Sequence, residues 1–209
     1  MLPTPRYLMT DPDEVRRVIR GNPWATFVST TASGLVASHY PVLLDEEAST
    51  GDDIVIISHF GKPDGDTHEL GQHEILVIMQ GPHDYVSSSW YDPDDIVPTW
   101  NHVTAHLYGV PEVLSDDENY RMLDRLTDHF EHHREGGRSL SENEEKARAT
   151  AKGTVGLRMR VTRFDARAKL SQNKSDHVRD TIVEHYDQSN PKLAHEMQRI
   201  RGERDVDKG

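Results

Sequence analysis

The sequence predicts a mainly β protein in which antiparallel strands form a barrel and helices lie around it. About six segments carry the alternating or continuous apolar patterns that are typical of strands. Turn-forming residues, rather than long helical segments, separate most of them, which argues against the strand–helix–strand order of a doubly wound sheet. The sequence also contains neither a Gly-x-Gly-x-x-Gly run nor a P-loop that could hold a phosphate.

The N-terminal half is expected to contain one helix followed by four strands. Thr10 suits the N-cap of a helix over residues 12–20, because a proline and two acidic residues follow in its first turn. The Gly21-Asn22-Pro23 sequence ends this helix. A turn at residues 31–34 joins the first two strands as a hairpin. The expected strands are residues 24–30, 35–44, 54–59 and 74–80, with a polar turn and a short helix within 60–70.

The C-terminal half mixes strands with more helices. Residues 99–114 alternate between polar and apolar side chains and are expected to form one long strand. Ser115 and the acidic residues after it are typical of the start of a helix, which runs to about residue 133. The remaining expected elements are a helix at 141–152, a strand at 153–164, and two helices at 175–186 and 190–200.

Length and composition limit the domain organisation and the location. A chain of 209 residues can form one domain with a helical extension, and we expect a barrel domain over 1–174, with a helical insertion at 115–152, and an extension over 175–209. No apolar run of about 18 residues predicts a membrane span. The absence of cysteine, and of an apolar segment after Met1, favours a cytoplasmic protein.

The charge balance argues against direct contact with DNA. The chain has 36 acidic and 24 basic residues, which gives a formal net charge of −12. Affinity for nucleic acid comes largely from contacts between cations and phosphates, so such a surface needs a local cluster of bases. The sequence shows no helix-turn-helix with a basic recognition face, and direct DNA binding is therefore doubtful.

The most unusual segment is residues 80–91, followed by Val97-Pro98-Thr99-Trp100-Asn101. It combines glycine and proline with serines and large aromatic residues, among them Trp90, Tyr91 and Trp100. Aromatic side chains in a polar, irregular segment can form a flat apolar wall for a planar ligand or a partner chain. The alternative is that they fill the core beneath a long loop.

An ordered set of motifs along most of the chain resembles the PaiB-like family of FMN-binding negative transcriptional regulators. Its members have the flavin split-barrel fold of the pyridoxamine-phosphate oxidases. The motifs that carry the resemblance are Trp24-Ala25-Thr26, the segment 38–45, Gln80-Gly81-Pro82-His83, Ser89-Trp90-Tyr91, Val97-Pro98-Thr99-Trp100-Asn101 and Lys169-Leu170-Ser171-Gln172-Asn173-Lys174. No short motif among them is specific by itself, whereas their order is.

The resemblance implies that FMN is held at the interface of a homodimer. Lys62, the one lysine before position 146, would suit the flavin phosphate, and amide side chains would suit the edge of the isoalloxazine ring. Some of these residues are expected to come from the second subunit. The candidate cofactor-binding residues are His39, Ser58, His59, Lys62, His83, Trp100, Asn101, Lys169, Gln172 and Asn173.

Two segments depart from the pattern of the family. Where relatives usually have Arg-Ala-Asn-Pro-Gln-Trp, this chain has residues 62–67, in which Asp64 replaces the asparagine and Asp66 is added. Two carboxylates beside a phosphate site should weaken phosphate binding. Ala168 also stands where a tryptophan commonly precedes the Lys-Leu-Ser-Gln-Asn motif. Both differences favour weaker binding of FMN or its loss.

Three functions remain open on the sequence. The first is an FMN-binding protein of the PaiB type that regulates transcription without an obvious DNA-binding motif. The second is a flavin-dependent oxidoreductase that acts on a small molecule, or a haem-handling split barrel, with unknown catalytic residues. The third is a metal site at the pairs His102/His106 and His129/His133, each four residues apart, for which a structural or surface role is favoured.

Overall fold

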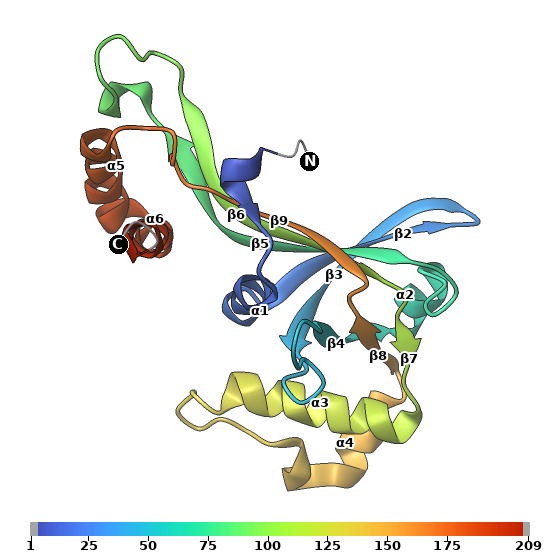
Figure 1. Ribbon diagram of the computed structural model, residues 1–209. Helices are drawn as coiled ribbons and strands as arrows, with labels where there is room; N and C mark the ends of the chain where they lie inside the picture. Colours follow the sequence, from blue (N-terminus) through green and yellow to red (C-terminus); the bar gives the residue numbers. More distant parts are fainter. Residues whose placement is uncertain (1–3, 207–209) are drawn as a thin grey trace. The chain divides into compact units, whose positions relative to one another are not determined.

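The computed structural model describes residues 4–206, with side chains up to residue 200, and two compact units are present (Figure 1). The sequence-based expectations for Met1–Pro3 and for residues 207–209 lie outside the described residues. We call residues 11–79 and 106–164 the sheet unit, and residues 4–10, 80–105 and 165–206 the helix-capped unit. No helix within 4–206 is long and apolar enough to cross a membrane.

The sheet unit is built from antiparallel strands, as the sequence predicts. The hairpin of β2 (Trp24–Thr31) and β3 (Gly34–Leu44) forms with Thr31 paired to Gly34 at its turn. The strand order continues from β5 (Ile75–Val86) through β2, β3, β4 (Val55–Gly61) and β8 (Thr154–Arg160) to β7 (Glu112–Val113). Each of these strands is hydrogen-bonded to an antiparallel neighbour in this order.

Apolar side chains from these strands form the core of the sheet unit. Phe27 and Phe60 are fully buried and pack edge to face, with their ring centroids 4.9 Å apart. Ile57 of β4 joins a second cluster beneath α3 (Asp116–Glu131), which contains Met122 and Leu126. Residue 58 faces away from Ile57 in the strand, because successive side chains alternate between the two faces. The packing of β4 therefore fixes where its candidate site residues point.

The helices of the sheet unit begin at side-chain caps. α1 (Pro12–Gly21) is capped by Asp11, whose carboxylate accepts a hydrogen bond from the Asp13 backbone at 2.9 Å. The prediction of Thr10 as this cap was wrong by one residue, since Asp11 also suits an N-cap and places Pro12 at the first helical position. α3 begins with the expected capping box of Ser115 and Glu118.

The other short elements of the sheet unit are helical. α2 (Lys62–Thr67) follows β4 directly, without the polar turn that the sequence predicts. The helix expected over 141–152 is divided into the 3-10 helix η3 (Leu140–Asn143) and α4 (Glu144–Ala151). The division arises because Asn143 caps α4 through its side chain.

The helix-capped unit contains strand ends and two C-terminal helices. Its strand order is β1 (Leu8–Met9), β9 (Arg163–Lys169), β6 (Thr99–Gly109) and β5. Helices α5 (Asp176–Ser189) and α6 (Pro191–Val206) pack against each other, and two 3-10 turns, η1 (Pro5–Tyr7) and η2 (Ser88–Trp90), complete the unit. Tyr186 of α5 is fully buried and donates a hydrogen bond to the Tyr85 carbonyl at 3.0 Å, which attaches the helices to β5.

Three strand boundaries differ from the sequence-based prediction. β5 does not stop before Gly81 but runs to Val86, and at Gly81 it passes close to the neighbouring strand, where an added Cβ would lie 3.1 Å from Val103. The long strand expected over 99–114 ends at Gly109 and resumes as β7. The strand expected over 153–164 divides into β8 and β9. Between the two strands, the Thr162 backbone N–H donates a hydrogen bond to the Tyr108 carbonyl.

Candidate functional site

Four candidate residues lie on the strands and helix of the sheet unit. Ser58 is buried and donates a hydrogen bond to the Pro41 carbonyl at 2.7 Å. His59 is partly buried; burial lowers the pKa of its imidazole, and its Nδ1 has no partner among the described residues. His39 of β3 and Lys62 of α2 are exposed. Ser58 thus has a structural hydrogen bond, whereas His59 has an unsatisfied buried nitrogen.

Asp64 is turned into the sheet unit, where two hydroxyl groups bind its carboxylate. The Tyr40 hydroxyl donates to Oδ2 at 2.6 Å, and the Ser38 hydroxyl donates to the same oxygen at 3.2 Å. Tyr40 also accepts a hydrogen bond from the Gly61 backbone at 3.1 Å, so that it joins β3 to the start of α2. Burial, and then the hydrogen bond to Asp64, raise the pKa of Tyr40. The Asp64 carboxylate, which the sequence suggests would oppose a phosphate, therefore accepts hydrogen bonds from two hydroxyl groups of the protein.

His68 extends this arrangement into the core. Its Nδ1 lies 2.8 Å from the Ser29 hydroxyl, and its Nε2 lies 3.1 Å from the Ser38 hydroxyl. The side chain is only 1% exposed, and burial lowers the pKa of its imidazole. A neutral imidazole has one donor and one acceptor, which the two hydroxyl groups satisfy. Sequence analysis missed this network; the alternation that places Ser38 and Tyr40 on one face of β3 was the available signal.

An exposed aromatic surface lies in the helix-capped unit. The Trp100 side chain is 54% exposed and the Tyr85 side chain 44% exposed, with their ring centroids 6.1 Å apart. His83, also exposed, lies 6.4 Å from Trp100 with its ring inclined by 31°. We call these three residues the aromatic surface. Because β5 and β6 are neighbouring strands, the position of each ring is set by the sheet.

Lys169 anchors the strand end that carries Trp100. Its amino group donates to the Thr99 hydroxyl and, at 3.1 Å, to the Trp100 carbonyl. Burial, and then the charge of Lys174, lower the pKa of Lys169. His102, two residues further along β6, likewise has a pKa that burial lowers. Lys169 thus holds the backbone beneath the aromatic surface through two internal contacts.

The side chains of Asn101 and Gln172 close the turn after β9. Asn101 is fully buried and accepts a hydrogen bond from the Ser171 hydroxyl at 3.0 Å. Gln172 donates to the Ala168 carbonyl at 2.5 Å and accepts from the Leu170 backbone at 2.7 Å. Ser171 has a φ of 60°, a left-handed conformation that costs energy for a residue other than glycine. These contacts explain the Leu-Ser-Gln part of the motif as a brace for the turn.

Asn173 and Lys174 continue from this turn toward neighbouring segments. Asn173 is exposed and accepts a hydrogen bond from the Tyr7 hydroxyl at 3.3 Å. Lys174 forms an ion pair with Asp95, and its amino group lies 3.9 Å from the centre of the Tyr91 ring. The second lysine of the motif is thus a structural contact, while Asn173 retains an exposed amide.

Two of the three aromatic residues singled out in the sequence pack inside the helix-capped unit. Trp90 stacks on His185 of α5, with ring centroids 4.4 Å apart and an angle of 15° between the planes. Tyr91 is buried, at 8% exposure. Of the two interpretations of these rings, the structure therefore favours packing for Trp90, which α5 contacts, and for Tyr91, which Lys174 contacts. Of these three aromatic residues, Trp100 alone is exposed.

The histidine pairs do not form a metal-binding arrangement in the part of the chain that the structure describes. Among residues 4–206, no group of three or more His, Asp or Glu side chains is placed to hold a metal ion. His133 also lies beyond the end of α3 at Glu131, so that it does not share a helical face with His129 as the spacing predicts. The His132 and His133 rings instead pack edge to face at 4.8 Å.

The sequence model of a family described as "Putative FMN-binding domain" matches residues 1–163. The protein named Protease synthase and sporulation protein PAI 2 of Bacillus subtilis (strain 168) is 32% identical over 184 residues, which cover 86% of each chain. A match over most of the chain shows membership. The chain belongs to this family of PaiB-like, FMN-binding proteins, and it is a flavin-binding protein of the PaiB type with FMN as its cofactor.

Solved structures confirm the predicted fold class. An FAD- and haem-binding protein from Mycobacterium smegmatis matches with a TM-score of 0.58 at 18% identity, over 81% of this chain and 76% of that one. The flavocytochrome Anf3 from Azotobacter vinelandii matches with a TM-score of 0.55 at 11% identity, over 77% and 68% of the two chains. At these identities the likeness concerns the fold alone, which is the antiparallel split barrel with helices.

The residues of the sheet unit fit the cofactor of the family. Lys62 is an exposed cation with no acidic partner among the described residues, and such a group suits a phosphate. Asp64 lies two residues from Lys62 and could have formed an ion pair with it, but its carboxylate accepts hydrogen bonds from Tyr40 and Ser38. The buried Nδ1 of His59 lacks a hydrogen-bond partner among the described residues, and a ligand atom could satisfy it.

Proposed function

We propose that the chain binds FMN as a homodimer and that the amino group of Lys62 pairs with the flavin phosphate. The observation that carries the proposal is the state of the two charges in α2: Lys62 is exposed without an ion-pair partner among the described residues, while the Asp64 carboxylate is engaged by hydroxyl groups. His39 and His59 remain candidates for contact with the same cofactor. Ser58, whose hydroxyl is committed to Pro41, would position the strand instead.

We propose that the aromatic surface of the second subunit, and not that of the chain whose Lys62 binds the phosphate, contacts the flavin ring. Trp100 and Tyr85 expose large ring faces on neighbouring strands, and His83 adds a polar ring beside them. Asn173 would supply an exposed amide, whereas Lys169, Asn101 and Gln172 would act as supports, because their polar atoms already bind within the unit. When bound, FMN supplies redox chemistry, and the protein's part is to hold and orient it.

The experiment is a titration of FMN into the wild-type protein and into Lys62→Ala. The loss of one charge-assisted contact, worth roughly 1.5–3 kcal/mol, should weaken FMN binding about tenfold or more. Riboflavin, which lacks the phosphate, should bind both proteins alike. Lys192→Ala is the matched control, since Lys192 is an exposed lysine of α6 in the other unit. Equal FMN affinity in Lys62→Ala would refute the assignment.

A separate variant tests the aromatic surface. Trp100→Ala removes the exposed indole and should weaken both FMN and riboflavin, because stacking acts on the ring that the two ligands share. Trp24→Ala is a suitable control: Trp24 is similarly exposed, at 61%, but belongs to the sheet unit. If Trp100→Ala leaves both affinities unchanged, the ring is bound elsewhere. The two variants therefore test the phosphate and ring assignments independently.

Homodimer formation is supported by apolar side chains in contact with water. Leu35 is 75% exposed at the β2–β3 hairpin, and Ile96 and Val97 are 74% and 70% exposed in the helix-capped unit. Adjacent exposed apolar side chains, such as Ile96 and Val97, are the kind of surface that marks contact with a partner chain, whereas a single one such as Leu35 is weaker support. A cytoplasmic location is also proposed; it rests on a sequence without cysteine.

Regulation, if this chain shares it with its family, is proposed to act through bound flavin or a partner protein instead of direct DNA contact. Six basic residues between positions 158 and 174 could form a stripe, and five of them are paired with acids: Arg158 with Asp45, Arg160 with Asp53, Arg163 with Glu74, Arg167 with Asp165, and Lys174 with Asp95. The sixth, Lys169, contacts the Thr99 hydroxyl and the Trp100 carbonyl. A base that contacts an acid must give up that contact before it can neutralise a phosphate. Titration with the chain's own upstream DNA at physiological salt should show no specific complex, and submicromolar, competitor-resistant binding would overturn this view.

A further inference from the structure

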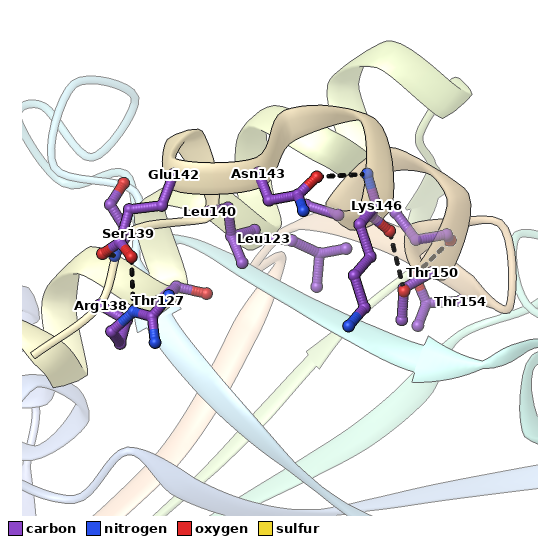
Figure 2. A pocket seen from close by; sticks show the side chains of 12 residues that line it. Leu123, Thr127, Arg138, Ser139, Leu140, Glu142, Asn143, Lys146, Thr150 and Thr154 are labelled. Atoms are coloured by element: carbon purple, nitrogen blue, oxygen red, sulfur yellow. Dashed lines mark hydrogen bonds and ion pairs between the residues drawn. The ribbon is translucent and has the colours of Figure 1, made fainter.

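A cavity of about 400 Å³ lies in the helical insertion, between α3, η3 and α4 (Figure 2). None of its lining residues is a flavin-binding candidate. Its wall is mostly apolar and includes Leu123, Leu140, Ala147 and Ala151. Leu123 also packs against the buried cluster that contains Ile57, so that the cavity floor is continuous with the core of the sheet unit.

The polar groups around this cavity are largely satisfied by the protein. Asn143 accepts a hydrogen bond from the Lys146 backbone at 3.1 Å, and Thr150 donates to the Lys146 carbonyl at 2.9 Å. Arg138 forms an ion pair with Glu142 at 2.5 Å. A ligand would therefore meet few unsatisfied polar groups along the wall.

Lys146 is the exception. Within residues 4–206 it is the one charged residue of the lining that lacks an ion-pair partner, although Glu144 and Glu145 precede it in the helix. Figure 2 shows its side chain extended to the same side of the α4 ribbon as Leu123 and Leu140. An unpaired cation beside an apolar cavity complements a ligand with one negative charge and an apolar body.

We propose that this cavity binds an apolar monocarboxylate, with the carboxylate on Lys146 and the hydrocarbon against Leu123 and Leu140. The volume is within the range of roughly 300–1,000 Å³ that is typical of small-molecule sites. The cavity is separate from the flavin candidates, so the inference does not depend on which of them binds FMN.

Calorimetric titration with decanoate tests the proposal, with decanol as the neutral analogue. Decanoate should bind saturably, at micromolar to low millimolar concentration, and more tightly than decanol. Lys146→Met keeps the length of the side chain and removes its charge; because the ion pair is exposed to water, decanoate should weaken about three- to tenfold. Decanol should be unaffected, and Lys192→Met, which alters a lysine outside the cavity, should bind decanoate like the wild type.

A second variant tests the location of the hydrocarbon. Ala147→Trp places a large ring in the cavity and should abolish decanoate binding, while circular dichroism and the thermal midpoint report that the fold is retained. The absence of saturable binding by decanoate overturns the proposal, as does equal binding of decanoate by the wild type and the folded Ala147→Trp variant. Equal decanoate affinity in Lys146→Met removes Lys146 as the carboxylate partner. Self-association of the chain that closes the cavity to decanoate would also contradict the proposal.

Discussion

The replacement of Asp64 by asparagine introduces the residue that the resemblance to the PaiB-like family leads us to expect there, and we expect it to destabilise this chain. Asp64 Oδ2 accepts hydrogen bonds from Tyr40 at 2.6 Å and from Ser38 at 3.2 Å. A hydrogen bond to a charged group contributes roughly 1.5–3 kcal/mol, against about 1 kcal/mol for a neutral pair. With two such bonds weakened, and the lower desolvation cost of a neutral amide offsetting part of the loss, Asp64→Asn should lower the free energy of unfolding by about 1–2 kcal/mol.

Urea unfolding followed by circular dichroism at pH 7.5 measures this change. A loss of that size corresponds to a fall in the thermal midpoint of about 2–8 °C for a chain of this length. Asp66→Asn is the matched control: Asp66 is an exposed acid of the same helix, and its replacement should alter the free energy by less than about 0.5 kcal/mol. Tyr40→Phe combined with Asp64→Asn should cost less than the sum of the two changes.

The alternative is that Asp64 has no structural role and has only a repulsive effect on phosphate. In that case, Asp64→Asn would leave stability unchanged and strengthen FMN binding markedly. Equal unfolding midpoints for Asp64→Asn and the wild type, with full additivity in the double variant, would refute a structural role for the Asp64 carboxylate. Together, the stability and FMN measurements separate the two possibilities.

Three further predictions concern stability and assembly. Because burial lowers the pKa of His68, its contribution to stability is present above the unfolded value of about 6.5 and is lost as the pH falls through the folded value; urea midpoints from pH 7.5 to 5 should fall less in His68→Gln than in the wild type. Gly65→Ala should destabilise the sheet unit by about 1–3 kcal/mol, since its Cβ would lie 2.5 Å from Val155; a gain in the thermal midpoint would contradict this. Light scattering should give twice the chain mass of 23.8 kDa at micromolar concentration, and a monomer mass would exclude the homodimer.

Patterns that act over a few residues predicted much of the fold. The β2–β3 hairpin and the capping box of α3 follow from turn and cap residues, and their local chemistry determines them. The continuation of β5 past Gly81 could not be predicted, because the close approach of Gly81 to Val103 involves a neighbouring strand. The structure thus departs from the prediction where a distant segment decides the local geometry.

The candidate site shows the same limit. Trp90 and Tyr91 resembled Trp100 in the sequence, and only the packing of α5 and the contact with Lys174 distinguish them. The roles of Ser171 and Asn101 depend on a hydrogen bond between residues that are 70 positions apart. Asp64 was interpreted as a charge near a phosphate, whereas the structure directs it to Tyr40. The individual flavin contacts remain predictions.

Equilibrium binding of FMN and riboflavin to the purified wild-type chain tests the central claim most directly. The perturbed visible spectrum of the bound flavin gives the stoichiometry, and competition between the two ligands gives the contribution of the phosphate. We expect saturation at one FMN per chain and about tenfold or greater preference for FMN over riboflavin, because the contact that we propose for Lys62 is with the phosphate, which riboflavin lacks. No saturable binding of FMN, or equal affinity for the two flavins, would contradict the claim.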